Sequence, residues 1–453
     1  MDVILITIDS LRFDDFMRFA RGILNLMKKR SVVFTNATAP GPSTSPSILA
    51  MLTSELPLEY GGYYTLSQRR ISIAEVMAKH GYTCICLQTN DFLSPRLGWA
   101  RGFHIYEKLF PEREPAIRKI VKRLTKLSVV GKVLSPFMEA LRPDKPVCRA
   151  DYVLKRALKL FSSIKGPKFL WLHLMDIHAP FIPEKRAMAK LAISTNYERI
   201  LNSNLKWIYE PEKLKAEDVE LLRQLYRAEI VSLDEKLLKW LSHIMKISDL
   251  SDLCIVITAD HGEEFYDHGG HDHTSKLYDE LIHVPLLIMG PGLPEGKVFE
   301  GPVSLMDIPP TLVSMALGLR SVNRKWRGID LTGVVNNDEG SLGRLAVMSE
   351  VAHERPWKVD LSCLKVAARS GDWKVIYDAE KKRYEIYDLS SDPSEQHDVS
   401  SSAPRNQALK SMKSMVSKRV FGLLIRSRLK RRFKKSKRQG TSQAHKRLAD
   451  EKP

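Results

Sequence analysis

The chain has 453 residues, of which 71 are Lys or Arg and 53 are Asp or Glu, so its formal net charge is +18. Its hydrophobic share of 43% is ordinary for a folded soluble protein and excludes a disordered, collagen-like or disulfide-scaffold chain. The length suffices for two or three domains, or for one large α/β domain with an appendage.

The positive charge is concentrated at the C-terminus. From Arg405 to Pro453 there are 17 Lys and Arg against 2 Asp and Glu, a net charge of +15. The remaining net charge of residues 1–404 is therefore only +3. The composition therefore predicts a nearly neutral body followed by a basic tail.

The cysteines and the apolar runs indicate the cellular compartment of the protein. Five scattered cysteines, an odd number, do not form a disulfide framework and favour a reducing compartment. The first residues lack the basic region of a secretion signal, and no run approaches the roughly 18 apolar residues that a membrane span needs. We therefore expect a cytoplasmic protein, with membrane contact, if any, peripheral.

Short apolar runs alternate with helical patterns along most of the chain. Strands are expected at Val3–Ile8, Cys84–Gln88, Phe169–Leu174, Leu253–Thr258 and Val284–Met289, and helices at Ile73–Lys79 and Glu220–Leu241. This alternation predicts an α/β fold with a mostly parallel central sheet and helices on both faces. Later, Ala367–Tyr377 and Arg383–Leu389 alternate like paired strands, which predicts a small C-terminal antiparallel sheet.

These changes of pattern divide the chain. We expect a large domain at residues 1–340 with a helical insertion at 111–150, an α+β subdomain at 341–400 and the basic tail at 401–453. The insertion is basic and ends in a Pro-rich stretch. A solvated helical excursion whose apolar face packs on the core is the favoured interpretation. A lid, a partner surface or an element resting on a membrane is the alternative.

Three of the expected strands end in acidic or histidine residues. Asp9 follows the first, Asp176 and His178 follow the strand at 169–174, and Asp260 and His261 follow the strand at 253–258. In open α/β sheets ligands bind at the carboxyl ends of the strands. Since Asp and His supply oxygen and nitrogen ligands, the pattern predicts a divalent cation there.

The loop at residues 39–43 runs into an apolar helical pattern and has the Pro, Ser and Thr residues of a helix start. Thr44 or Ser45 is expected near the cap and Pro46 in the first turn. The free N–H groups and the dipole of such an end favour an anion, so a hydroxyl there would lie beside a bound phosphate or sulfate. A plain helix cap is the alternative. Three further histidines, His268, His271 and His273, are denser than a solvated loop needs.

In their order and spacing these segments resemble the sulfatase-like branch of the alkaline phosphatase superfamily, up to about Val399. The matching segments are Ile4–Asp9 with Ser10-Leu11-Arg12, Thr44-Ser45-Pro46-Ser47, Ile73–Tyr82, Arg101-Gly102-Phe103, His173–Pro180, Asp260-His261-Gly262-Glu263, Leu277–Glu280 with Val284-Pro285-Leu286, Asp307–Thr311, and Tyr387-Asp388-Leu389 with Asp392-Pro393.

The resemblance implies one divalent cation, bound by Asp9, Asp260 and His261. It implies that Thr44, two residues before the loop proline, is the nucleophile and completes the metal ligands.

The resemblance also implies that His178 and His273 face the substrate, where an imidazole binds the anion or protonates the leaving oxygen. Asn90 and Lys276 are further candidates for substrate binding, with a surface or capping role as the alternative.

The nucleophile segment departs from the sulfatase pattern. Sulfatases carry Cys or Ser in a Cys/Ser-x-Pro-x-Arg motif, which is oxidised to formylglycine, whereas this chain has Thr44 and, in place of the arginine, Ile48. We therefore expect no formylglycine. An unmodified Thr is similar to the nucleophile of the phosphoester hydrolases and phosphoethanolamine transferases of the superfamily, which favours a phosphoester. Because Ser10 follows Asp9 where sulfatases often have a second carboxylate, Zn²⁺, Mn²⁺, Ca²⁺ and Mg²⁺ remain open.

The basic tail mixes apolar and basic residues at roughly helical spacing between Lys418 and Lys435. A basic amphipathic helix can lie on an anionic membrane surface. Nucleic acid is the less favoured partner, because the apolar side chains of Phe421, Leu423, Leu424 and Ile425 would not serve phosphate contacts. A disordered solubilising tail is the third alternative.

Three functions are therefore in competition. The first is a metal-dependent phosphoester hydrolase or phosphotransferase that acts through Thr44 on a small-molecule, glycan-linked or lipid-linked ester. The second is a sulfuric ester hydrolase without formylglycine. The third is a silent binder of anionic polymers, against which the full set of Asp9, Thr44, Asp260 and His261 argues.

Overall fold

The computed structural model describes residues 1–109, 149–273, 275–319, 323–336, 344–355, 358–404 and 406–450. The helical insertion expected at 111–150 therefore lies almost wholly outside the described residues.

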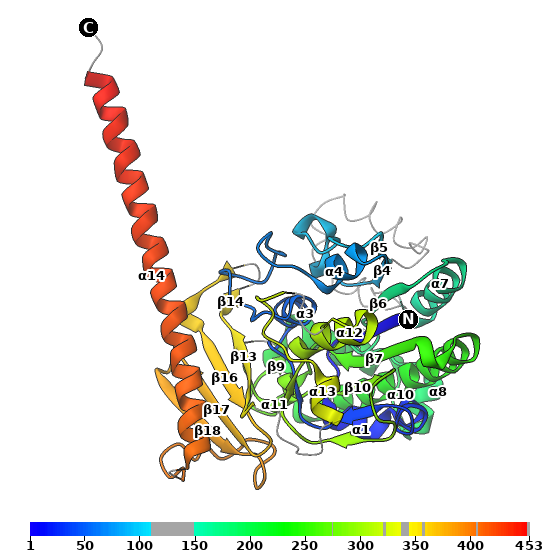
Figure 1. Cartoon of the computed structure of the whole chain (residues 1–453). Helices are drawn as coiled ribbons and strands as arrows, with labels where there is room; N and C mark the ends of the chain where they lie inside the picture. The colour runs from blue at the N-terminus through cyan, green and yellow to red at the C-terminus, as the bar shows by residue number, and fades with distance from the viewer. Residues whose placement is uncertain are drawn as a thin grey trace, which may run out of the picture.

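The core of the body is an eight-stranded sheet (Figure 1). In spatial order its strands are β11 (Val298–Phe299), β2 (Val32–Phe34), β10 (Leu286–Met289), β7 (Leu253–Ala259), β1 (Asp2–Ile8), β6 (Lys168–Leu174), β4 (Thr83–Gln88) and β5 (Ile105–Lys108). Strand β1 lies between β6 and β7 and is parallel to both. Since helices cover the sheet, the run Val3–Ile8, which is apolar except for Thr7, is buried on both faces. The predicted mostly parallel sheet is confirmed.

One expected parallel strand runs the other way. Strand β10 is antiparallel to both β7 and β2. Strand β10 follows β7 in the sequence and lies beside it, and the connection between them has no long crossover helix. Such a connection can join antiparallel strands, whereas parallel neighbours need a crossover. An apolar run looks the same in either direction, so the sequence pattern could not show this.

Two groups of helices pack against the sheet (Figure 1). One group gathers around the long helix α10 and comprises α1 (Phe13–Phe19), α2 (Arg21–Met27), α7 (Ala150–Ser163), α8 (Lys185–Lys190), α9 (Tyr197–Tyr209) and α10 (Ala216–Ile247). The other comprises α3 (Thr44–Thr53), α4 (Ile73–Lys79), α12 (Ile308–Leu317) and α13 (Leu331–Asn336). Helix α4 begins and ends at the predicted residues, because Ser72 and Glu75 form a capping box at its start.

The C-terminal part forms a second, antiparallel sheet, as predicted. Its strands are β13 (Val347–Val351), β16 (Lys365–Arg369), β17 (Trp373–Asp378) and β18 (Arg383–Asp388). The expected hairpin between β17 and β18 is present. The single strand expected over residues 367–377 is instead two strands, because the chain turns at Ser370, whose side-chain oxygen accepts a hydrogen bond from the Trp373 N–H at 2.9 Å.

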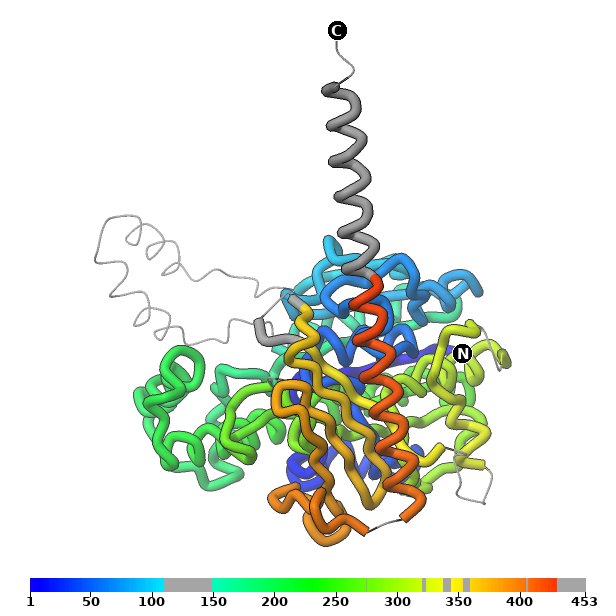
Figure 2. Tube along the Cα trace, turned by 90° about the vertical axis from the view of Figure 1, so that its left-hand side faces the viewer, coloured from blue at the N-terminus to red at the C-terminus, as the bar shows by residue number. Residues whose placement is uncertain are grey.

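The packed body extends beyond the limit expected near Ser400. Helix α14 (Gln407–Asp450) lies along β16 and β17, and Figure 2 shows its first part in front of the C-terminal sheet. One face of this part is buried and consists of Leu409, Met412, Val416, Val420 and Leu423. The spacing of three and four residues places these side chains on one side of a helix. The first part of the basic C-terminal segment therefore packs against the body of the protein.

The described structure also contains short two-stranded pairs: β3 (Ala37–Thr38) with β12 (Val303–Ser304), β8 (Glu264–Phe265) with β9 (His271–Asp272), and β14 (His353–Arg355) with β15 (Lys358–Val359). No helix in the described ranges is long and apolar enough to cross a membrane.

Candidate active site

The four residues expected to bind a cation lie together at the carboxyl end of the central strands. Asp9 follows β1, Asp260 and His261 follow β7, and Thr44 is the first residue of α3; all four are buried. The Thr44 hydroxyl donates to Asp9 Oδ2 at 3.3 Å, and the same Oγ1 lies 3.3 Å from His261 Nε2. His261 Nε2 is 3.5 Å from Asp260 Oδ2 and 3.6 Å from Asp9 Oδ1. We call these four residues the central cluster.

Asn90 belongs to the same site. It follows β4, and its side-chain Nδ2 donates to Asp9 Oδ2 at 3.0 Å and to Thr44 Oγ1 at 3.4 Å. Its Oδ1 accepts from the Phe92 N–H at 2.9 Å, which caps a short 3₁₀ turn. Asn90 is therefore both a cap and a group in contact with the central cluster.

A further residue, which the sequence analysis did not single out as a site residue, is His173. It lies within β6, in register with Thr7 of β1, and is fully buried. His173 Nε2 is 3.2 Å from Asp9 Oδ2, and its Nδ1 is 2.9 Å from the Thr7 hydroxyl. A histidine inside an otherwise apolar buried strand was the available signal. It indicates a paired polar group, because an unpaired one is costly there.

The third strand end does not reach the site in the way expected. The carboxylate of Asp176 accepts hydrogen bonds from the Ala150 N–H at 2.9 and 3.1 Å, at the start of α7. An acidic side chain stabilises a helix N-terminus. The contribution of β6 to the central cluster is therefore His173, one position before the end of the strand, while His178 lies beyond it.

His273 lies beside the central cluster and His178 lies beside His273; that both face the substrate stays a prediction. The ring centroid of His273 is 4.4 Å from that of His261 and 5.2 Å from that of His178. His273 Nδ1 lies 2.7 Å from Asp272 Oδ1 and 3.5 Å from Glu263 Oε1. Two carboxylates thus lie beside the imidazole of His273.

The other residues of the histidine-rich stretch contact neighbouring residues of the same loop. Lys276 Nζ donates to Glu264 Oε1 at 2.7 Å and to the carbonyl oxygen of His268 at 2.8 Å. The His268 ring stacks on Tyr278 with centroids 3.7 Å apart, and its Nδ1 is 2.7 Å from Glu280 Oε1. The structure therefore gives Lys276 an ion pair within the loop, and a substrate-binding role for it stays a prediction.

Buried charges shift the protonation of the site. Burial and the neighbouring charge of Asp9 raise the pKa of Asp260 to about 7. Burial alone would also raise the pKa of Asp9, but the hydrogen bond from His173 and the charges of His178 and His261 hold it well below its usual range. Burial and the charge of His273 lower the pKa of His261 to about 3. Two buried carboxylates beside a neutral imidazole form a site that favours a cation.

The donor set also fits a divalent cation. Asp9, His173 and Asp260 each offer one ligand atom, and these atoms lie within 4.8 Å of one another. Asp260 Oδ2 is buried and has no hydrogen-bond partner in the described structure. Carboxylate oxygen with imidazole nitrogen suits Zn²⁺ or Mn²⁺. A second group of this kind in the described ranges is Glu263, Asp272 and His273.

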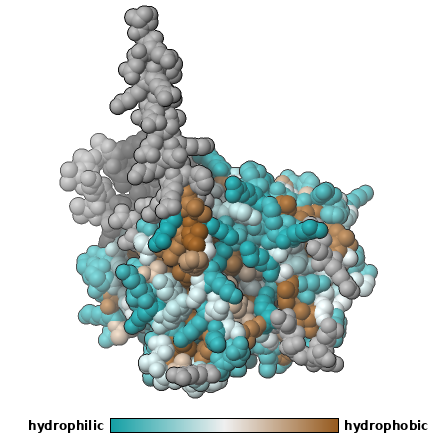
Figure 3. Space-filling view, turned by 60° about the vertical axis from the view of Figure 1, so that its left-hand side comes forward, coloured by the Kyte–Doolittle hydropathy of each residue, from teal (hydrophilic) through white to brown (hydrophobic). Residues whose placement is uncertain are grey.

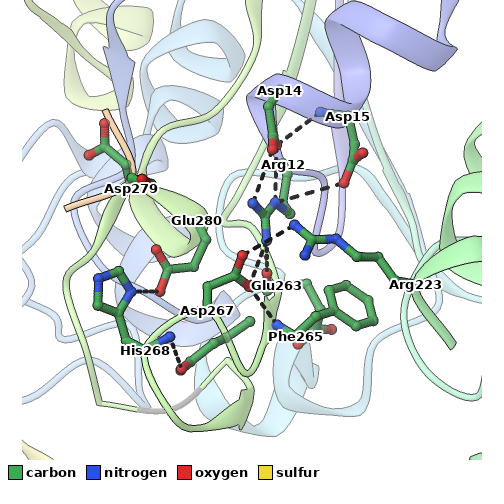
Figure 4. A network of polar contacts seen from close by, with 12 residues as sticks. Arg12, Asp14, Asp15, Arg223, Glu263, Phe265, Asp267, His268, Asp279 and Glu280 are labelled. Carbon is green, nitrogen blue, oxygen red and sulfur yellow. Dashed lines mark hydrogen bonds and ion pairs between the residues drawn. The ribbon is translucent and has the colours of Figure 1, made fainter. Parts of the chain in front are cut away.

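A buried arginine ties the two loops of the site together (Figure 4). The guanidinium of Arg12, just after β1, donates to Asp14 at 3.0 Å, to Asp267 Oδ2 at 3.0 Å and to the carbonyl oxygen of Glu263 at 3.3 Å. These contacts join the segment after Asp9 to the segment after His261. The loop after β1 is therefore held fast on the loop after β7.

The glycine after His261 is required by close packing. A Cβ at Gly262 would lie 2.0 Å from the carbonyl oxygen of Glu280. Every other residue type would push the loop after β7 away from α11 (Asp279–Ile282). Gly262 thus sets the position of His261.

Comparison with known proteins identifies a family. Residues 1–319 match the family model described as Sulfatase. Choline-sulfatase of Rhizobium meliloti is 30% identical over 408 residues, which cover 82% of this chain and 76% of that protein. Arylsulfatase K of Rattus norvegicus is 24% identical over 447 residues, covering 89% of this chain and 75% of that protein.

Solved structures show the same fold. The phosphonate monoester hydrolase of Agrobacterium radiobacter superposes with a TM-score of 0.71 at 19% identity, covering 94% of this chain and 95% of the other. A protein solved in complex with its substrate D-glucosamine-2-N,6-O-disulfate superposes with a TM-score of 0.70 at 16% identity, covering 93% and 98% of the two chains.

Proposed function

This chain belongs to the sulfatase family of metal-dependent ester hydrolases, within the alkaline phosphatase superfamily, and we propose that it cleaves a phosphate ester with Thr44 as the nucleophile. The observation that carries the proposal is the contact of Thr44 Oγ1 with both Asp9 and His261. A helix cap alone would not need that contact. The Ser43 side chain, at the N-cap position itself, makes no capping hydrogen bond.

The position of Thr44 also suits an anionic substrate. It is the first residue of α3, a helix of ten residues. The N-terminal N–H groups and the dipole of a helix favour negative charge. A tetrahedral ester group next to Thr44 would therefore be attracted by this helix end and by the imidazoles of His178 and His273.

The cation of the family would be held by Asp9, Asp260, His261 and Thr44, with His173 as a further nitrogen donor. When bound, it lowers the pKa of a coordinated hydroxyl and neutralises an oxygen of the ester. Zn²⁺ or Mn²⁺ suits the imidazole-containing donor set best.

The remaining groups supply proton transfer. Thr44 loses its proton to water, its oxygen forms a bond to phosphorus, and the bond between phosphorus and the leaving oxygen breaks. Burial alone would lower the pKa of His273, but the charge and hydrogen bond of Asp272 hold it well above its usual range, so His273 carries a proton to give to the leaving oxygen. Water then attacks phosphorus, gives a proton to His273, and Thr44 leaves and is reprotonated from solvent.

The side chain at position 48 supports an unmodified threonine. Ile48 lies within α3 and is fully buried in the core. An arginine here would place a charge in that core, so α3 is not built to hold the arginine of a formylglycine motif. We therefore propose that the enzyme works without formylglycine.

Sulfate esters are the second candidate substrates. The relatives named choline-sulfatase and arylsulfatase K favour this alternative, in which the same hydroxyl and cation act on sulfur. A phosphoethanolamine-type transfer to an acceptor other than water is a variant of the first mechanism. In each case the ester belongs to a small molecule, a glycan or a lipid, in keeping with the disulfated glucosamine bound by one structural neighbour.

A reducing setting inside the cell is part of the proposal. Cys84, Cys86, Cys254 and Cys363 are buried free thiols. Burial raises the pKa of Cys84 to about 12, so this thiol stays protonated and unreactive.

The test is turnover of p-nitrophenyl phosphate, bis-p-nitrophenyl phosphate and p-nitrophenyl sulfate by the purified full chain, with and without a chelator and added Zn²⁺ or Mn²⁺. We expect metal-dependent phosphoester turnover that Thr44→Ala lowers at least about 1000-fold. The matched control is Ser47→Ala, which removes a second hydroxyl buried in α3 that makes no hydrogen bond. Turnover of the sulfate alone, or turnover that survives Thr44→Ala, contradicts the proposal.

A further inference from the structure

Helix α14 has two apolar faces, and only one of them is covered within the described structure. Its buried face packs on β16 and β17. On another side, Phe421, Ile425 and Leu429 are 66%, 37% and 48% exposed. Side chains four residues apart lie above one another on a helix, so these three form a continuous line, which we call the apolar stripe.

Figure 3 shows apolar surface on the described part of α14, next to the point where the grey atoms begin. Single exposed apolar residues are common on proteins and need no explanation. A stripe of three in register on a helix that is already anchored by its opposite face is a different case, since it has the form of an interaction surface.

Ion pairs fix the orientation of the apolar stripe on the body. Arg419 donates to Glu350 at 2.7 and 2.9 Å and to Glu59 at 2.8 Å, and these side chains are nearly buried. Arg426, one residue beyond Ile425, pairs with Glu59 at 3.1 Å. Glu59 follows α3 closely in the chain, so the stripe is rigidly placed relative to the helix that carries Thr44.

The sequence from the middle of the apolar stripe onward is strongly basic. Between Arg426 and Arg438 nine of thirteen residues are Lys or Arg, and none is Asp or Glu. A helix with apolar side chains on one line and basic residues around them is suited to the boundary between lipid headgroups and acyl chains. Anionic lipids attract the basic residues, and the boundary takes up the apolar ones.

We propose that α14 inserts the apolar stripe into the interface of an anionic membrane and so holds the enzyme on that surface in one orientation. The charge complementarity selects anionic lipid, and the stripe selects a membrane over nucleic acid. A nucleic acid would neutralise the arginines and lysines but would leave Phe421, Ile425 and Leu429 in water. The proposal does not depend on which ester the enzyme cleaves.

The test is co-sedimentation of the full chain with vesicles of phosphatidylcholine alone and of phosphatidylcholine with 30% phosphatidylglycerol, at low and high salt. We expect binding to the anionic vesicles only, weakened by salt. The triple variant Phe421→Gln/Ile425→Gln/Leu429→Gln keeps every charge and should lower the partition coefficient about 100-fold.

The matched control is Ile71→Gln/Ile208→Gln/Val298→Gln, which removes three apolar side chains of similar exposure (40%, 44% and 47%) from the body. It should bind vesicles as the unchanged protein does, and both variants should keep the melting temperature. No vesicle binding overturns the proposal, as does equal binding by the triple variant, which would show attraction by charge alone. A fluorescent DNA duplex is the remaining arm: binding to the duplex but not to vesicles overturns it in favour of nucleic acid.

Discussion

Replacing Glu59 by Gln is expected to loosen α14 from the body. The Glu59 carboxylate is the shared acceptor of three arginines: Arg419 at 2.8 Å, Arg426 at 3.1 Å and Arg327 at 3.2 Å. The side chains of Glu59 and Arg419 are only 11% and 10% exposed, whereas Arg327 and Arg426 are both 51% exposed. Gln keeps the shape of the side chain and removes its charge.

The size of the effect follows from the pKa of Glu59. Burial would raise it, but the charges of Arg419 and Arg327 and the hydrogen bond from Arg426 lower it from 4.5 to about 2. Each pKa unit corresponds to about 1.4 kcal/mol, so the ionised form stabilises the folded state by about 3 kcal/mol. Because two of the three arginines are half-exposed and screened by solvent, we expect about 2 kcal/mol.

The pH dependence has a definite sign. The pKa of Glu59 in the folded state is lower than in the unfolded state, so the stabilisation is complete above pH 4.5 and is lost as the pH falls through that value toward 2. The difference between the unchanged protein and Glu59→Gln should therefore be full at pH 7 and smaller at pH 3.5.

The assay is hydrogen exchange of the backbone amides of residues 409–424, which reports the local opening of α14. A loss of about 2 kcal/mol speeds exchange about 30-fold at pH 7. The control is Glu380→Gln, which breaks the pair of Lys365 with a half-exposed carboxylate and should change the free energy by less than about 1 kcal/mol. Exchange in Glu59→Gln no faster than in this control would refute the reasoning.

Three further predictions concern the site. His173→Ala should lower the affinity for Zn²⁺ or Mn²⁺ by about 10–100-fold, measured by metal analysis after dialysis against a graded chelator; unchanged metal content would show that the imidazole only fills space. Asp272→Asn removes the charge that raises the pKa of His273, so the alkaline limb of the kcat/KM profile should move to lower pH, whereas an unmoved limb would exclude His273 as the acid. Gly262→Ala sets a Cβ against a main-chain oxygen and should cost about 1–3 kcal/mol in thermal unfolding, whereas Gly333→Ala, where a Cβ meets nothing within 4 Å, should not destabilise the protein.

The sequence was most informative where one local pattern decides the structure. The β-branched run that forms β1, with Asp9 at its end, could be read directly, because a buried parallel strand is apolar on both faces. The same is true of α4, whose capping box fixes its start. The meeting of Asp9 and His261 followed from the strand pattern, since parallel strands bring their carboxyl ends to one edge. The approach of Thr44, which begins a helix, was implied only by the family resemblance.

The sequence was least informative where distant partners decide. His173 became recognisable as a site residue only once its register with Thr7 was known. The direction of β10 depends on its neighbours in the sheet and not on its own residues. The packing of α14 was hidden because its buried face shares a segment with the basic residues, so the overall charge of the tail obscured the apolar spacing.

The central place of β1 has a consequence for synthesis on the ribosome. One edge of β1 pairs with β6, and the other pairs with β7, which is made some 250 residues after β1. At roughly 5–20 residues per second, β1 waits roughly 10–50 s for its second neighbour. An apolar strand with an unpaired edge is prone to pair with other chains. The nascent enzyme should therefore depend on chaperones that shield its first strand until β7 emerges.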